Sequence, residues 1–373
     1  MDKSYNGIAP DGSSPYYTTE QLPVLLVIGV PDNIISKGTG AIDYDEDDPW
    51  ADKEMFFYAF KRDLSTSFSD LSKDSGSSCL IDGSRDGENN IAGKAARKNT
   101  MDQYIAWTGI ERNVLYPPDY IPYDFYGYFI DDMEISARDI TRTEDAITIA
   151  ITIDGSQDVM SAMAELTDEQ LNGHEYTDRE KMEIMNYSFS SFTAQRGIHP
   201  TFLFNHHLSR LRFSLSAGST AAENVYVDSI KVMSKARGIF TVAHKSPQNM
   251  GVDFSAETEY RPLALTEDDG SRLRTNTYHT DGGVKDLPVG GSLLLAPDDE
   301  YEVHMFVSET TNDGKKHTYE NIFTIRSNSG SFSPGTQYSV RVTIYGLQSV
   351  YPSVTLEPWG YGGHIIIDDD QWM

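Results

Sequence analysis

The acidic run from Asp43 to Glu54 is the densest group of side chains in the sequence that could bind a metal ion. Carboxylates stand at positions 1, 3, 5 and 12 of this run, as they do in the calcium-binding loop of an EF-hand. The sixth position of such a loop needs glycine for its sharp turn, but here it is Asp48, and Pro49 follows. No flanking pair of helices is evident, because Glu54 begins a strand-like run. We therefore expect a solvated acidic loop, with calcium binding as the alternative.

Three histidines, His199, His206 and His207, form the second candidate group. Neighbouring residues of a strand point to opposite faces, so His206 and His207 cannot easily share a metal ion, and a structural or surface role is expected. His174-Glu175 lacks the second histidine of a zinc-protease motif, and neither Gly-x-Ser-x-Gly nor a P-loop occurs. The sequence therefore predicts no catalytic residue, no metal site and no cofactor. An enzyme on a β-scaffold would need two carboxylates paired across a cleft, which sequence alone cannot identify.

The charge balance narrows the range of partners. The chain has 373 residues, with 57 acidic and 30 basic side chains and a formal net charge of −27. Such a charge repels nucleic-acid phosphates and anionic membrane surfaces, so neither is an expected partner. The lone cysteine, Cys79, excludes an intrachain disulfide and a multi-cysteine zinc site. No run of about 18 apolar residues that could span a bilayer is present.

The elements that must position any site are predicted to be strands. In Leu22–Val30 the residues Leu22, Val24, Leu26, Ile28 and Val30 share one face, while Leu25 and Val27 lie on the other, so we expect burial on both faces. Further strands are predicted at Glu54–Phe60, Tyr123–Ile130 and Ala146–Ile153.

The second half of the chain alternates more regularly between apolar and polar residues. Ser209–Ser216, Tyr301–Ser308, Tyr319–Ile325 and Tyr338–Gly346 predict antiparallel strands, the middle two joined by a hairpin turn at Asn312-Asp313-Gly314. Helices are predicted only at Ala162–Leu171 and Asp178–Met185. The aromatic run Tyr116–Tyr128 favours a sandwich core, with stacking on sugar rings as the alternative.

Residues 1–21 are polar and rich in Gly, Ser and Pro, which predicts a flexible leader. The opening lacks the basic and apolar regions of a secretory signal. Two interpretations stay open from this observation: a cytosolic protein, or one whose processed segment precedes Met1.

Five stretches, in order along the chain, carry a resemblance to a known family. They are Leu22–Val30 with Ser36–Ile42, Tyr116–Tyr128, Asp158–Ala162, Phe204–Phe213, and Pro334–Gly346 with Trp359. Phe204–Phe213 (FNHHLSRLRF) is similar to a family signature F-x-H-x-L-S-R-L-x-F. Together these stretches resemble the fimbrillin family, the subunits of type V pili in anaerobic Gram-negative bacteria.

The resemblance implies an all-β fold of two tandem transthyretin-like sandwiches with few short helices. The implied domains are residues 22–199, with a first strand at 22–30 and a maturation loop at 31–42, and residues 200–373, with terminal strands at 353–367. It also implies a non-enzymatic lipoprotein of the cell surface. The resemblance implies attachment to the outer membrane through an acylated cysteine that is not part of this sequence.

In this family a trypsin-like protease cuts the loop after the first strand, which then leaves, and a strand from another subunit refills the groove. By resemblance, the displaced strand is the one with Leu22, Val24, Leu26, Ile28 and Val30, and the cut follows Lys37. The family usually has arginine there, so a subunit that keeps its strand, as a tip or accessory piece, stays open. An ordinary surface role for Lys37 is the other alternative.

The replacing strand is expected near the C-terminus, with Ile365, Ile366 and Ile367 as candidates. Equally, the terminal strands could complete the sheet of their own domain. The predicted function is a structural or adhesive pilus subunit whose partners are other pilins and a maturation protease. The alternative is a surface lipoprotein that binds carbohydrate or a host ligand without polymerising.

Overall fold

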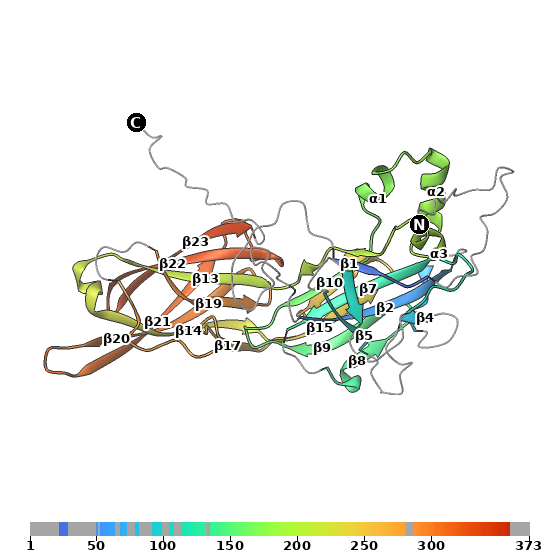
Figure 1. Cartoon of the computed structure of the whole chain (residues 1–373). Coiled ribbons are helices and arrows are strands. Elements are labelled where there is room, and N and C mark those ends of the chain that lie inside the picture. The colour runs from blue at the N-terminus through green and yellow to red at the C-terminus, as the bar shows by residue number, and fades with distance from the viewer. Residues whose placement is uncertain are drawn as a thin grey trace.

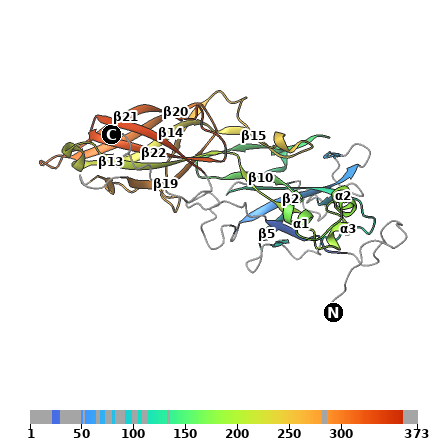
Figure 2. The same cartoon turned by 90° about the horizontal axis from the view of Figure 1, so that it is seen from above.

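The computed structural model of the chain describes residues 22–28, 50, 53–63, 68–72, 79–81, 92–98, 104–107, 114–131, 135–280 and 286–358. In these ranges strands dominate, and the predicted all-β fold class is confirmed. The α-helices in these ranges are α1 (Asp168–Asn172), α2 (Asp178–Asn186) and α3 (Ser191–Ala194). None of them has the length and apolar character needed to cross a membrane. Figures 1 and 2 show the strands gathered into two lobes side by side, with the helices on the N-terminal one.

The C-terminal lobe is a sandwich of two sheets, with strand orders β19-β13-β22-β23 and β17-β14-β20-β21, where β18 also pairs with β14. The inward side chains of β13 and β22, such as Phe213 and Val340, are buried as the alternation predicts. The predicted hairpin is present, with Gly314 at φ +80° between β20 and β21. The strands are β13 (Ser209–Ala217), β14 (Val225–Lys235), β17 (Tyr260–Ala264), β18 (Tyr278–His279), β19 (Leu287–Leu295), β20 (Glu300–Thr310), β21 (Lys316–Arg326), β22 (Thr336–Gly346) and β23 (Ser349–Pro358).

The N-terminal lobe contains a ten-stranded sheet and a four-stranded one. The larger has the order β11-β1-β6-β5-β2-β7-β10-β12, with β3 and β4 also on β2, and the smaller has the order β16-β15-β9-β8. The strands are β1 (Leu26–Ile28), β2 (Glu54–Asp63), β3 (Phe68–Ser69), β4 (Cys79–Ile81), β5 (Lys94–Lys98), β6 (Tyr104–Trp107), β7 (Tyr123–Ile130), β8 (Ile140–Arg142), β9 (Ala146–Thr152), β10 (Val159–Met163), β11 (Thr201–Phe202), β12 (Asn205–His206), β15 (Arg237–His244) and β16 (Gly251–Asp253).

The ten-stranded sheet closes on itself. Its two end strands, β11 and β12, belong to one short segment of the chain. Thr201 pairs with Val27 of β1 on one side and bridges Glu165, just after β10, on the other. The rings of Phe202 and Phe57 lie 5.0 Å apart although β1, β6 and β5 separate their strands in the sheet order. We call this closed part of the lobe the barrel, because its edges meet around a common apolar core.

The core of the barrel lies on the concave side of this sheet. The buried side chains that fill it are Val24, Leu26, Trp50, Met55, Phe57, Ala59, Leu80, Ile81, Ala96, Ile105, Tyr116, Tyr123, Phe125, Phe129, Met160, Ala162, Ala164, Phe189, Phe202 and Phe204. The opposite face of β7 packs against the four-stranded sheet, where the rings of Tyr128 and Phe240 lie 6.1 Å apart. All eight residues of β7 are therefore buried.

The expected division into residues 22–199 and 200–373 does not hold for the four-stranded sheet. β15 and β16 come from the second half of the chain but pair with β9 from the first half. The extended chain from Val225 to His244 is interrupted only at Ala236, so it leaves one lobe and enters the other without a turn. No turn signal marks this crossing in the sequence. The N-terminal lobe thus depends on residues from both halves of the chain.

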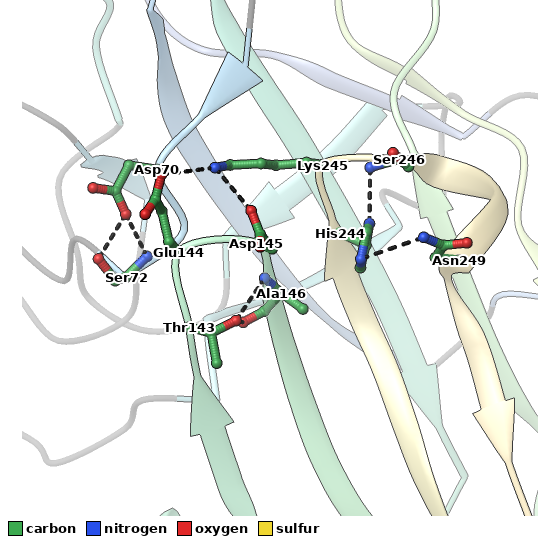
Figure 3. A network of polar contacts seen from close by, with 10 residues as sticks. All are labelled: Asp70, Ser72, Thr143, Glu144, Asp145, Ala146, His244, Lys245, Ser246 and Asn249. Carbon is green, nitrogen blue, oxygen red and sulfur yellow. Dashed lines mark hydrogen bonds and ion pairs between the residues drawn. The ribbon is translucent and has the colours of Figure 1, made fainter. Parts of the chain in front are cut away.

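A polar network fixes the end of β15 to the N-terminal lobe (Figure 3). The Lys245 ammonium donates to Glu144 Oε1 at 3.1 Å and Asp145 Oδ1 at 3.0 Å in the turn between β8 and β9. Desolvation alone would lower the pKa of Lys245, but its hydrogen bonds to Asp145 and Glu144 raise it overall. The connection between halves is therefore reinforced by charge as well as by strand pairing.

The helix predicted at Ala162–Leu171 is wrong at its start, since β10 continues to Met163 and α1 begins at Asp168. Thr167 accepts a hydrogen bond from the Gln170 backbone N–H while the Gln170 side chain accepts one from the Thr167 N–H, and this capping box sets the start of the helix. The helix predicted at Asp178–Met185 is confirmed as α2.

Candidate functional site: the seat of the first strand

The first strand of the chain is an interior strand of the barrel. β1 runs antiparallel to β6, with Val27 opposite Tyr104, and parallel to β11, with Val27 opposite Thr201. Just before it, Pro23 bridges Leu115. We call these neighbours of β1, namely β6, β11 and residues 114–116, the seat of the first strand.

Backbone hydrogen bonds hold this strand on both edges. The Val24 N–H donates to the Val114 carbonyl at 2.8 Å, and the Leu22 carbonyl accepts from the Tyr116 N–H at 2.9 Å. On the other edge the Val27 N–H donates to the Pro200 carbonyl at 3.0 Å. An interior strand leaves two rows of unpaired polar groups if it is removed, whereas an edge strand leaves one.

The side chains of the first strand are buried on one face only. Val24 is 3% exposed and Leu26 is fully buried, and both belong to the barrel core. Leu25 and Val27, on the other face, are half-buried, so the expectation of burial on both faces is wrong. The barrel has its packed core inside, and among the described residues no second layer buries its outer surface here fully. Leu22 is half-buried, only the backbone of Ile28 is described, and Val30 lies outside the described residues.

Aromatic rings line the interior of the barrel around the seat. Tyr116 packs beside Tyr123 and Phe125, with ring centroids 6.4 Å and 6.3 Å away. Burial raises the pKa of Tyr116 well above its usual value. The aromatic run Tyr116–Tyr128 thus builds cores, as expected, and its buried rings are not available to stack on sugars.

The other predicted site residues lie largely outside the described ranges. These are Lys37 with the maturation loop, the acidic run except Trp50, Lys53 and Glu54, and the donor candidates Ile365, Ile366 and Ile367. The structure does place residues up to Pro358. β23 pairs with β22 from Ser349 to Pro358, so this part of the terminal segment completes its own sheet.

His206 and His207 have separate partners. His206 Nδ1 lies 2.8 Å from Asp158 Oδ2, and His207 Nε2 lies 2.7 Å from Ser161 Oγ. Burial and the neighbouring His206 lower the pKa of His207 to about 4, and burial lowers that of His199. Between residues 135 and 280, where these side chains lie, no group of three or more metal-ligating side chains is arranged to hold an ion. Their contacts are those of residues that join strands.

β11 is a neighbour of β1 that the sequence does not predict. Thr201–Phe202 lies in the stretch that was interpreted as a domain boundary, and two residues are too few for a periodic signal. The alternation of Phe202 and Phe204, both in the barrel core, is the signal that could have indicated a strand there.

Comparisons with known proteins gave matches only among solved structures. No family model matches the chain, and no curated protein matches it in sequence. A proposed cell adhesion protein from Bacteroides uniformis is 13% identical with a TM-score of 0.47, over 92% of this chain and 99% of that one. One from Bacteroides ovatus is 12% identical with a TM-score of 0.48, over 91% and 98%. The fimbrial anchor protein Mfa2 from Porphyromonas gingivalis is 11% identical with a TM-score of 0.34, over 90% and 98%.

These proteins agree with the fimbrillin resemblance at the level of the fold.

Proposed function

We propose that this chain is a structural or adhesive subunit of a cell-surface type V pilus that assembles by strand exchange. The observation that carries the proposal is the position of β1, which fills an interior place in the barrel although it lies at the N-terminal end of the described chain. Only the segment 29–49 joins it covalently to the rest of the barrel. A cut there would leave the strand held by non-covalent contacts alone.

The energetics of the seat favour replacement of β1 by another strand over departure of β1 without a replacement. Burial of Val24 and Leu26 contributes roughly 1.5–3 kcal/mol for each side chain. An empty seat would also expose the unpaired edges of β6 and β11. An open barrel of this kind favours the addition of another extended strand, and strand addition can serve as the bond of a polymer.

The proposed trigger is a trypsin-like protease that cuts after Lys37. The proposed replacing strand is the terminal segment of another copy, with Ile365 and Ile367 on one face and Ile366 on the other. β23 pairs with β22 from Ser349 to Pro358, so this pairing does not use the candidate donor residues. Export, a lipid anchor and an outer-membrane location are part of the proposal and are supported by the family resemblance.

A disulfide across the first strand tests this mechanism. Val27 and Tyr104 are directly opposite in antiparallel strands, a geometry that brings two Cα atoms within the range of a disulfide. In a Cys79→Ala background, the double variant Val27→Cys with Tyr104→Cys should fold, be cut after Lys37 and stay monomeric when oxidised. Reduction should restore polymers on size-exclusion chromatography. Polymerisation of the oxidised, cut protein would contradict strand exchange at β1.

One observation favours the alternative of a carbohydrate-binding surface lipoprotein. Tyr345 and Tyr351 are 45% and 63% exposed on neighbouring strands, with ring centroids 5.5 Å apart. Exposed aromatic rings are suited to contact sugar rings. Binding on a glycan array that is lost in Tyr351→Ala, without polymers after protease treatment, would support this function instead.

A further inference from the structure

We propose that Gln170 is a positioning residue that holds β11 in place when β1 leaves, so that the vacated seat keeps its shape for an incoming strand. The inference rests on the proposed strand exchange and adds a device for it outside the barrel strands. The device is the helical insertion between β10 and β11, which we define as residues 164–200.

β11 is a weak wall of the seat when its pairing is considered alone. It has two residues, and its strand partner in the barrel is β1. Departure of β1 removes the hydrogen bond from the Val27 N–H to the Pro200 carbonyl. A backbone bond that then remains runs from the Glu165 N–H to the Thr201 carbonyl at 3.2 Å. So short a strand needs further support to stay in position.

Gln170 supplies that support from α1. Its Nε2 donates to the His199 carbonyl at 2.8 Å and to Thr201 Oγ1 at 3.1 Å. Its Oε1 accepts from the Thr167 N–H at 3.0 Å, which is the capping contact. One amide side chain therefore joins the start of α1 to the segment that enters β11, on the side away from β1.

The insertion has the rigidity that such a support requires. A separate small core of Tyr120, Ile184, Phe192 and Ile198 holds its helices to the lobe. Ile198 comes just before His199, so the segment that Gln170 binds is also anchored in this core. None of these side chains belongs to the core that contains Val24 and Leu26, although Leu166 packs against both cores.

A second capping box on α2 provides a matched control. Thr177 and Glu180 form the same pair of contacts at the start of α2 that Thr167 and Gln170 form at the start of α1. Glu180, however, makes no contact with β11 in the described structure. The variant Gln170→Glu keeps an acceptor for the Thr167 N–H but loses the amide that donates to His199. Gln170→Glu therefore removes the support of β11 and keeps the capping contact of α1. Glu180→Met removes a capping contact of α2 and leaves the support of β11 in place.

The test uses the full chain with a site-specific protease sequence placed after Lys37. After cutting, capture of a fluorescent synthetic peptide of residues 20–30 is measured by anisotropy. Loss of the part-buried hydrogen bond to the His199 carbonyl should weaken capture by Gln170→Glu about tenfold. Glu180→Met should capture the peptide as well as the parent does. Equal capture by the parent and Gln170→Glu would overturn the role of Gln170.

Failure of the parent itself to capture the peptide would count against strand exchange and is separable from failure of the support. In that case hydrogen exchange of residues 199–204 in the uncut proteins decides. Exchange several-fold faster in Gln170→Glu than in Glu180→Met supports the role of Gln170 in holding β11, and equal rates overturn it.

Discussion

Among the described strands, the first one of the N-terminal lobe is paired along both edges, whereas the last one of the C-terminal lobe is paired along one. β1 has three residues, yet it lies between β6 and β11 and places Leu26 in the barrel core. β23 has ten residues but lies at the end of its sheet, and its Leu356 is 49% exposed. The shorter strand thus has the more interior position, and the longer strand has the more peripheral one. The short strand completes a barrel, while the long one extends the edge of a sandwich and packs the half-buried Val350 and Val354 against its core.

The largest expected effect follows from the strands that the second half of the chain contributes to the N-terminal lobe. A chain of residues 22–199 lacks β15 and β16, so it would expose the face of β7 that Phe240 covers. We expect this fragment to aggregate or to show no cooperative unfolding transition by circular dichroism. A fragment extended to residue 358 serves as the control. Cooperative unfolding of the shorter fragment would show that the N-terminal lobe folds without β15 and β16, and would contradict the importance given to these strands.

A matched pair of truncations sharpens the contrast between β1 and β23. Leu26→Ala removes a fully buried side chain and should lower the free energy of unfolding by about 2–5 kcal/mol. Leu356→Ala removes a half-exposed one and should cost less than about 1 kcal/mol. Urea denaturation of both variants checks the order. Equal losses would mean that the first strand is no more integral to its lobe than the last.

The smallest expected effect is a difference in pH response between the lobes. In the C-terminal lobe, hydrogen bonds to Glu320 and Glu302 raise the pKa of His304. The stabilisation that His304 contributes should be fully present below about pH 6.5. It should be lost as the pH rises through the raised pKa of this residue. In the N-terminal lobe, His207 has its pKa lowered to about 4, so the unfolded chain binds the proton more readily. Stability from this residue should be lost as the pH falls from about 6.5 to about 4.

Hydrogen exchange resolved by lobe, at pH 5, 6.5 and 8.5, measures these opposite trends. His304→Gln should reduce the loss of protection from exchange that β20 and β21 show as the pH rises to 8.5. His207→Gln should reduce the loss of protection that residues near β12 show as the pH falls to 5. His174→Gln, on an exposed loop, is the control. The same trend in both lobes would contradict the assigned causes.

Much of the strand content could be predicted, because the two-residue alternation of apolar side chains and the aromatic content of a run indicate which residues are buried. The alternation of β13 and β22 and the aromatic run of β7 identify core faces without knowledge of the partners. The closure of the barrel could not be predicted, because it depends on the two-residue strand β11 and a single bridge from Thr201 to Glu165. The return of β15 to the first lobe was also missed, since Ala236 interrupts the extended chain without a turn residue. Strand exchange, the cut after Lys37 and the donor residues remain proposals.

Native mass spectrometry of the protein cut after Lys37 tests the central claim most directly. The account predicts that the N-terminal fragment stays bound at first and is displaced when a peptide of residues 353–373 is added, with one peptide gained for each fragment lost. A fragment that dissociates without replacement from a barrel that remains folded and monomeric would contradict it, as would a fragment that the added peptide never displaces.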